Sequence, residues 1–183
     1  MIVVEEKGIA KRSLADIKND LMTFFTARIK HLLSEKEVRY DLVDAVLGGT
    51  IGNVSSLVNR ALVLEQKKNE ETFKETMEAL SRVMNIAVKL TDAPKIKEEL
   101  FENDFETKLY TSYKQVVEQF EATEDVSKRF DLLASLKTDI ENYFENTMVM
   151  AEDEAVRFNR LSLMKEISGL IGKFAHMNKV LSL

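Results

Sequence analysis

Positive charges set among apolar residues are the feature of this sequence with the clearest chemical meaning. Arg28 and Arg160 each fall on a run of apolar residues spaced three or four positions apart, the spacing of one helix face. A charge on such a face must pair with an acid, extend to water, or line a groove that holds a ligand. Two interpretations stay open. Both arginines edge a groove for nucleotides, or they form structural ion pairs with Asp41, Asp44 or Asp153.

The surroundings of Arg160 follow from a helical wheel with about 100° per residue. Arg160 lies inside the apolar face of the last expected helix, and Arg157 lies at the edge of that face. Asp153 precedes Arg157 by four residues, an order that favours an ion pair on a helix. Lys165 is a candidate contact for an RNA backbone phosphate. The apolar face consists of Val156, Met164, Ile167, Leu170, Ile171, Phe174 and Met177.

Arg39 and Tyr40 are adjacent and lie between two expected helices. A guanidinium beside an aromatic ring can stack an unpaired base. The alternative is an ordinary turn in which Tyr40 is half buried. The candidate contacts for unpaired nucleotides are therefore Arg28, Arg39, Tyr40, Arg157, Arg160 and Lys165.

Patterns for catalysis and metal binding are weak. His31 and His176 are the only histidines, and neither has the spacing of a zinc or di-iron motif. Cysteine is absent, which excludes disulfides, thiolate zinc sites and a cysteine nucleophile. The acidic run at 152–154 suits a helix start better than a metal. The sequence therefore predicts no active site, metal or cofactor in this chain.

The segment Gly48-Gly49-Thr50-Ile51-Gly52 has the glycine content of a phosphate-binding loop. It lacks the Lys-Ser/Thr pair of a P-loop, and it follows an expected helix rather than a strand. We therefore expect a helix C-cap and turn here, with phosphate binding as the alternative.

Composition favours long helices in a reducing compartment. The 183 residues include one proline and six glycines, and 45% are apolar. The net charge of −5 gives no overall basic field, so any RNA contact must come from a local cluster. The N-terminus lacks the cationic and apolar parts of a signal peptide, and no stretch is long enough to span a membrane. We expect a cytoplasmic protein.

The periodicity predicts an all-α bundle of about seven helices. Residues 1–12 are expected to be a linker or the edge of a cloned fragment, and 13–183 a single helical domain with a candidate subdomain break near Pro94. The expected helices run from Ser13, as N-cap, to about 37, then over 41–47, 54–68, from 70 to before Pro94, from Asp104 to about 120, from Asp125 to about 144 with a kink or split, and from Asp153 almost to the end.

Local strings then resemble a known family. Residues 146–164, NTMVMAEDEAVRFNRLSLM, resemble the C-terminal signature of the bacterial glycyl-tRNA synthetase β subunit. Residues 24–28, FFTAR, and 39–47, RYDLVDAVL, resemble two upstream strings of that family in the same order. The similarity extends from about Ser13 to the C-terminus.

The resemblance implies an all-helical anticodon-binding domain of the DALR type, in an α2β2 enzyme. In that family the α subunit makes glycyl-adenylate from glycine and ATP with Mg²⁺, and the non-catalytic C-terminal part of the β subunit meets the anticodon. The expected function is binding of the anticodon loop, in support of attaching glycine to its tRNA. The expected partners are tRNA for glycine, the α subunit and the rest of the β subunit, with no DNA and no membrane. The alternative is a helical protein-interaction module whose arginines are purely structural.

Overall fold

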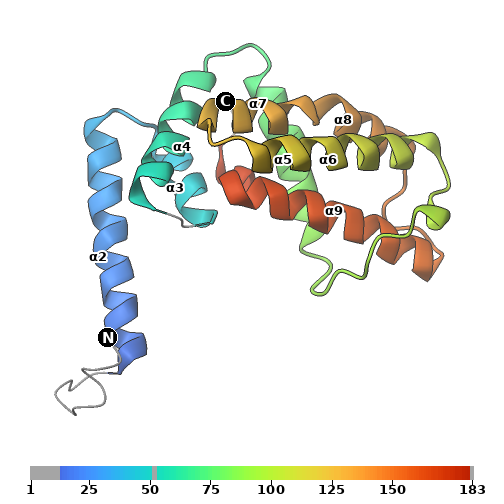
Figure 1. Ribbon diagram of the computed structural model, residues 1–183, viewed down its shortest axis with the longest axis horizontal. Coiled ribbons are helices and arrows are strands. Elements are labelled where there is room, and N and C mark those ends of the chain that lie inside the picture. Colours follow the sequence, from blue (N-terminus) through green and yellow to red (C-terminus); the bar gives the residue numbers. More distant parts are fainter. Residues whose placement is uncertain (1–12, 51–52, 182–183) are drawn as a thin grey trace.

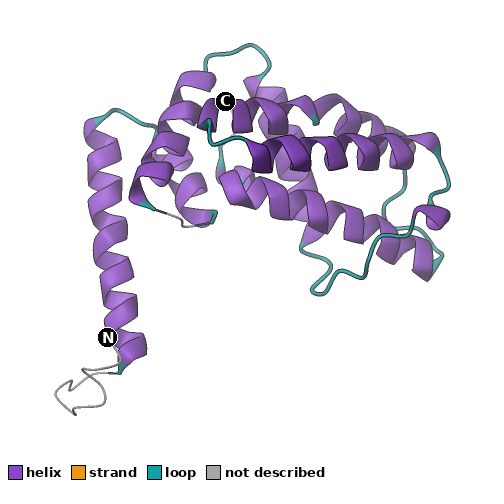
Figure 2. Ribbon diagram, in the orientation of Figure 1, coloured by secondary structure: helices purple, strands orange, loops and turns teal. Residues whose placement is uncertain are grey.

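The computed structural model describes residues 13–50 and 53–181, and the regular elements within these residues are helices (Figures 1 and 2). In chain order they are α2 (Leu14–Glu35), α3 (Tyr40–Gly48), α4 (Val54–Lys67), α5 (Phe73–Ala87), the 3-10 helix η1 (Glu98–Leu100), α6 (Asp104–Ala122), α7 (Val126–Ser135), α8 (Lys137–Asn146), α9 (Glu154–Phe174) and the 3-10 helix η2 (Met177–Lys179). The predicted all-α fold class is confirmed. None of the described helices is long and apolar enough to cross a membrane.

Helix α9 forms the centre of the bundle. It packs against α5 and also contacts α6, α7 and η1 (Figure 1). Every residue of the predicted apolar face is buried, including Met177 in η2, and Leu161 and Ser162 on other sides of α9 are buried as well. Burial on several sides of one helix is typical of a core element rather than a surface helix.

Polar side chains fix where several helices begin. Ser13, Asp125 and Asp153 accept hydrogen bonds from the first turns of α2, α7 and α9, as the sequence predicts. The stretch from 126 to 146 is split into α7 and α8 at Leu136, so the predicted break is confirmed. Residues 88–97, around Pro94, contain no helix.

The turn after α3 brings Gly49 against the end of α9. Gly49 is the C-cap of α3, which confirms the predicted cap. The backbone N–H of Thr50 donates to the carbonyl of Gly172 at 2.9 Å. A Cβ atom at Gly49 would lie 2.8 Å from that carbonyl oxygen, so only glycine fits this close approach. Ile51, Gly52 and residues 1–12 lie outside the described residues.

Helix α2 departs from its prediction. Its apolar residues were expected to face a core, but only Ile29 and Leu33 are buried. The C-terminal end of α2 rests on α3 and α4, and the rest of the helix extends away from the bundle (Figure 1). The spacing predicted the helix and its apolar face correctly, but it carried no information on whether a second element covers that face.

Candidate nucleic-acid interface

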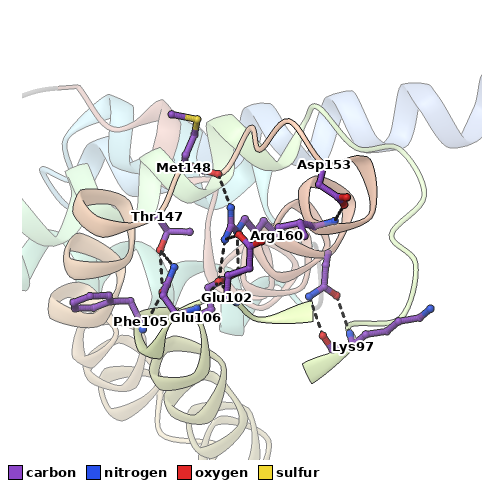
Figure 3. Close-up of polar contacts among 11 residues, drawn as sticks. Lys97, Glu102, Phe105, Glu106, Thr147, Met148, Asp153 and Arg160 are labelled. Carbon is purple, nitrogen blue, oxygen red and sulfur yellow. Dashed lines mark hydrogen bonds and ion pairs between the residues drawn. The ribbon is translucent and has the colours of Figure 1, made fainter. Parts of the chain in front are cut away.

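Arg160 is held by internal partners. Its side chain is 5% exposed, and its Nε and Nη2 atoms donate to the two carboxylate oxygens of Glu106 at 2.8 and 3.1 Å (Figure 3). Nη2 also donates to Glu102 at 2.8 Å, and Nη1 donates to the carbonyl of Met148 at 3.1 Å. These contacts favour the structural alternative for Arg160. Its partners are glutamates of α6 and the segment before it, not Asp41, Asp44 or Asp153.

Glu106 is fully buried and serves two purposes. Besides Arg160, it accepts the backbone N–H groups of Glu102 and Asn103, which completes a capping box at the start of α6. Asn159, also buried, donates to and accepts from the backbone of Lys97 at 2.9 and 2.8 Å. The polar residues of the string 146–164 therefore position loops around α9.

Arg157 does not make the predicted ion pair. Its Nη1 donates to the carbonyls of Ala151 and Glu152 at 2.9 and 3.2 Å, while Asp153 caps α9 through the N–H of Val156. A carboxylate at the N-cap already bonds the exposed N–H groups of the first turn, so Arg157 instead bonds carbonyls of the preceding loop.

Arg39 and Tyr40 differ in their surroundings. The Arg39 guanidinium donates two hydrogen bonds to the buried carboxylate of Asp41, which accepts a third from the N–H of Leu181 at 2.8 Å. Tyr40 is 67% exposed and lines a hollow of about 390 Å³ between α2 and α3. The same hollow contains the ion pair of Lys30 and Asp44. The Tyr40 ring is thus accessible for stacking with a base, whereas the Arg39 guanidinium is hydrogen-bonded within the protein.

The pKa of Asp41 follows from these contacts. Burial by itself raises the pKa of this carboxyl, but the hydrogen bonds from Arg39 and Leu181 outweigh burial and hold the pKa below its usual range. A carboxyl whose pKa is depressed by folding stabilises the protein fully above its unfolded pKa of about 4. That contribution is lost as the pH falls through the lower pKa of the folded state.

We therefore expect Asp41→Asn to weaken the acid dependence of stability. Between about pH 5 and 3 the free energy of unfolding should fall less steeply in this variant than in the wild type, as measured by urea titration at each pH. Asp44→Asn, which alters a more exposed carboxylate, is the matched control. Parallel pH profiles for Asp41→Asn and the wild type would show that Asp41 does not carry this dependence.

Arg28 lies on the exposed part of α2 and makes no ion pair within the part of the chain that the structure describes. The prediction of a charge on a core face does not apply to it, because that face is open to solvent. Arg28 is therefore available to a ligand or a partner.

Lys165 lines an open hollow beside α9. This open hollow has a volume of about 440 Å³, within the range of small-ligand sites. Four elements or their ends form it, namely the end of α3, α5, α9 and η2. Its lining residues are Gly48, Gly49, Thr50, Met84, Val88, Lys165, Ser168, Gly169, Gly172, His176 and Asn178. Of the candidate contacts, only Lys165 is among them.

The chemistry of this hollow suits an RNA nucleotide. No carboxylate is among the lining residues that the structure describes, and the ammonium group of Lys179 lies at its edge, beside Gly48. Burial, with help from Lys179, lowers the pKa of His176, so this imidazole is neutral at pH 7 and can both donate and accept. Thr50 and Ser168 add hydroxyl groups, and Val88 adds an exposed apolar surface.

Gly169 and Gly172 leave the floor of the hollow open. A Cβ atom at either position would have no other atom within 4 Å. Glycine inside a helix costs about 0.5–1 kcal/mol relative to alanine, and here that cost is not explained by close packing. The absence of side chains does allow a ligand to approach the backbone of α9.

Arg60 is a central residue that sequence reasoning missed. It is 4% exposed and donates to the carbonyls of Lys173, Phe174 and Thr50 at 2.9, 2.6 and 2.7 Å. It thereby satisfies the C-terminal carbonyls of α9 and holds Thr50 at the hollow. Its neighbours Ala61 and Leu57 mark the inner face of α4, and that signal was available in the sequence.

The described residues contain no cluster of three potential metal ligands.

Comparisons with a family model and with curated proteins point to the same family. A family model described as the DALR anticodon binding domain matches residues 60–176. The glycine–tRNA ligase β subunit of Bacillus subtilis is 39% identical over 169 residues, which are 91% of this chain and 25% of that protein.

Two further β subunits of glycine–tRNA ligases are similar. That of Halalkalibacterium halodurans is 37% identical over 97% of this chain and 26% of its own length. That of Listeria monocytogenes serotype 4a is 34% identical over 95% of this chain and 25% of its own length. The chain thus spans about a quarter of the length of these curated relatives, and the resemblance found in the sequence strings is confirmed.

Proposed function

The protein belongs to the DALR anticodon binding domain family, and we propose that it binds the anticodon loop of tRNA, with one loop nucleotide seated in the hollow beside Lys165. The observation that carries this proposal is the hollow itself. It is large enough for a base, open to the backbone of α9 at Gly169, and has lysines rather than carboxylates along its described edge.

Unpaired loop bases are recognised through hydrogen bonds at their edges and through stacking. Thr50, Ser168 and His176 offer donors and acceptors for a base edge, and Val88 offers an apolar surface for its ring. Lys165 and Lys179 would contact the adjacent phosphates. In the proposal, Tyr40 stacks a second base, while Arg39, Arg157 and Arg160 support the fold. Arg28, on the part of α2 that extends away from the bundle, is not assigned to the RNA.

The first experiment titrates the full chain with a glycine tRNA transcript and with the same transcript carrying a changed anticodon. At about 100 mM salt we expect the glycine tRNA to bind at least 10-fold more tightly, because a mismatched base leaves polar groups of the hollow unpaired. Affinity should fall steeply as salt is added. Equal affinity for the two transcripts would overturn anticodon recognition by this chain.

A second experiment fills the hollow. Gly169→Gln should lower the affinity for glycine tRNA by about 10-fold or more, because its side chain would occupy the space proposed for the base. Gly169→Ala is the matched control. Since its Cβ meets no other atom within 4 Å, it should raise the free energy of unfolding by about 0.5–1 kcal/mol and leave most of the affinity intact. Unchanged binding by a folded Gly169→Gln variant would place the RNA elsewhere.

The proposal extends to the enzyme in which such a domain works. Because its relatives are β subunits of glycine–tRNA ligases, we propose that the chain is a non-catalytic part of such a β subunit, acting in the cytoplasm in the attachment of glycine to its tRNA. ATP and Mg²⁺ would then act on the α subunit. The chain itself would contribute binding energy for tRNA and no catalytic group.

A further inference from the structure

Helix α2 presents a stripe of exposed apolar side chains that no other element of the described fold covers. Phe24 and Phe25 are 60% and 50% exposed and contact each other edge to face, with ring centroids 5.8 Å apart. The exposed apolar side chains of this helix are Leu21, Met22, Phe24, Phe25 and Leu32. Together they amount to on the order of 400 Å² of apolar surface, the size of the largest patch on a typical monomer, which is often functional.

The exposed apolar face of α2 lies mainly N-terminal to the contacts that this helix makes with α3 and α4. The core contacts of α2 come from Ile29 and Leu33, near its C-terminal end, and they leave Phe24 and Phe25 exposed. The helix projects from the bundle along most of its length (Figure 1). A 22-residue helix with an uncovered aromatic stripe exposes apolar surface to water that a partner would remove.

We propose that this face of α2 docks on the additional polypeptide by which the longer relatives exceed this chain. The chain matches only about a quarter of each relative, so roughly three quarters of such a protein lie outside the matched region. The partner surface is an apolar helix or sheet face with one carboxylate opposite Arg28, since Arg28 lies on the same side of α2 as Leu21 and Leu32 and has no ion-pair partner among the described residues.

A second copy of the chain fits this face less well. Two faces of this size would bury roughly 800 Å² in total, below the about 1,200 Å² at which specific stable interfaces begin. A partner with a wider surface can cover both the aromatic stripe and its margins. Docking of α2 does not depend on RNA binding at Lys165, so the two proposals can fail separately.

Thiol labelling tests the docking in the full chain, which contains no cysteine. Phe24→Cys is labelled in the chain alone and in a chimaera in which this chain replaces the matching 169-residue region of the Bacillus subtilis relative. Labelling is quantified on the α2 peptide by mass spectrometry. We expect at least 10-fold slower labelling of position 24 in the chimaera. Asn19→Cys, exposed on the opposite side of α2, should react equally in both.

Hydrogen exchange supplies a second measurement that needs no engineered protein. Amides of α2 in this chain should exchange at least 10-fold faster than those of the aligned segment in the intact Bacillus subtilis relative, because docking protects the helix. Equal labelling at position 24 in both settings, or equal exchange of the two segments, would overturn the proposal.

Self-association is the competing outcome. Sedimentation of the wild-type chain between about 5 and 200 μM should give a monomer. A dimer that Phe24→Glu abolishes would assign the face to a second copy and overturn docking on the longer polypeptide. Affinity of Phe24→Glu for glycine tRNA should match the wild type, and a selective loss of tRNA affinity would instead make the stripe an RNA contact.

Discussion

Replacing Arg160 by methionine is expected to lower the free energy of unfolding by about 3 kcal/mol. The substitution removes the guanidinium that pairs with both carboxylate oxygens of Glu106 and leaves a fully buried carboxylate with less compensation. Breaking one side of a buried pair costs about 3–5 kcal/mol, and we place this case at the lower end because Glu106 keeps two backbone N–H donors. For a chain of this size the melting temperature should fall by roughly 6–12 °C.

A double variant separates the buried charge from the lost packing. Arg160→Met combined with Glu106→Gln should recover part of the stability, because a neutral amide oxygen can still accept the capping bonds at the start of α6. Arg82→Met is a surface control, since the exposed Arg82 stacks on Phe144 and its loss should cost less than about 1 kcal/mol. If Arg160→Met melts like the wild type while its tRNA affinity falls, Arg160 acts on the ligand and the structural assignment is wrong.

Arg60→Met should have an effect of similar size, about 3 kcal/mol, with a different spatial pattern. Hydrogen bonds from a charged donor contribute about 1.5–3 kcal/mol, and this residue serves three carbonyl oxygens at once. Its loss frees the C-terminal carbonyls of α9 and releases Thr50 from the hollow. Arg60→Lys should restore little, because a single ammonium group lacks the planar fork of donors.

Hydrogen exchange can localise this effect. In Arg60→Met the N–H groups of Thr50 and His176, which bond to Gly172 and Ala45, should exchange faster even under conditions in which the chain stays folded. Arg129→Met is the matched control. Arg129 bonds the carbonyls of Phe120 and Thr123 at the end of α6, so its loss should loosen α6 and leave the hollow protected. Identical exchange patterns in the two variants would contradict a specific role for Arg60 at the hollow.

Arginines and lysines have different roles in this chain, and the difference explains how a domain with a net charge of −5 can bind RNA. Arginines with planar, multiply bonded guanidinium groups hold the fold at Arg39, Arg60 and Arg160. Lysines, which reach water on flexible stems, border the hollow. A local positive edge on an acidic body favours one RNA loop over indiscriminate binding to nucleic acid.

Much of the local structure was accessible from the sequence alone. The helix starts at Ser13, Asp125 and Asp153 and the cap at Gly49 follow from side-chain chemistry within a few residues of each boundary. The buried face of α9 follows from its period. The family strings likewise depend on local order, which is why they identified the relatives correctly.

Only the tertiary structure determines which charged side chains are buried and paired, and which apolar surfaces stay exposed. Glu106 lies 54 positions from Arg160, so nothing near that arginine could name its partner. The hollow at Lys165 forms where the end of α3, α5, α9 and η2 lie close together in space. Helical periodicity does not indicate which helices contact each other. The stripe on α2 has the pattern of a core face, yet no described element covers it, because burial depends on a partner in space whereas helical spacing depends only on the chain itself.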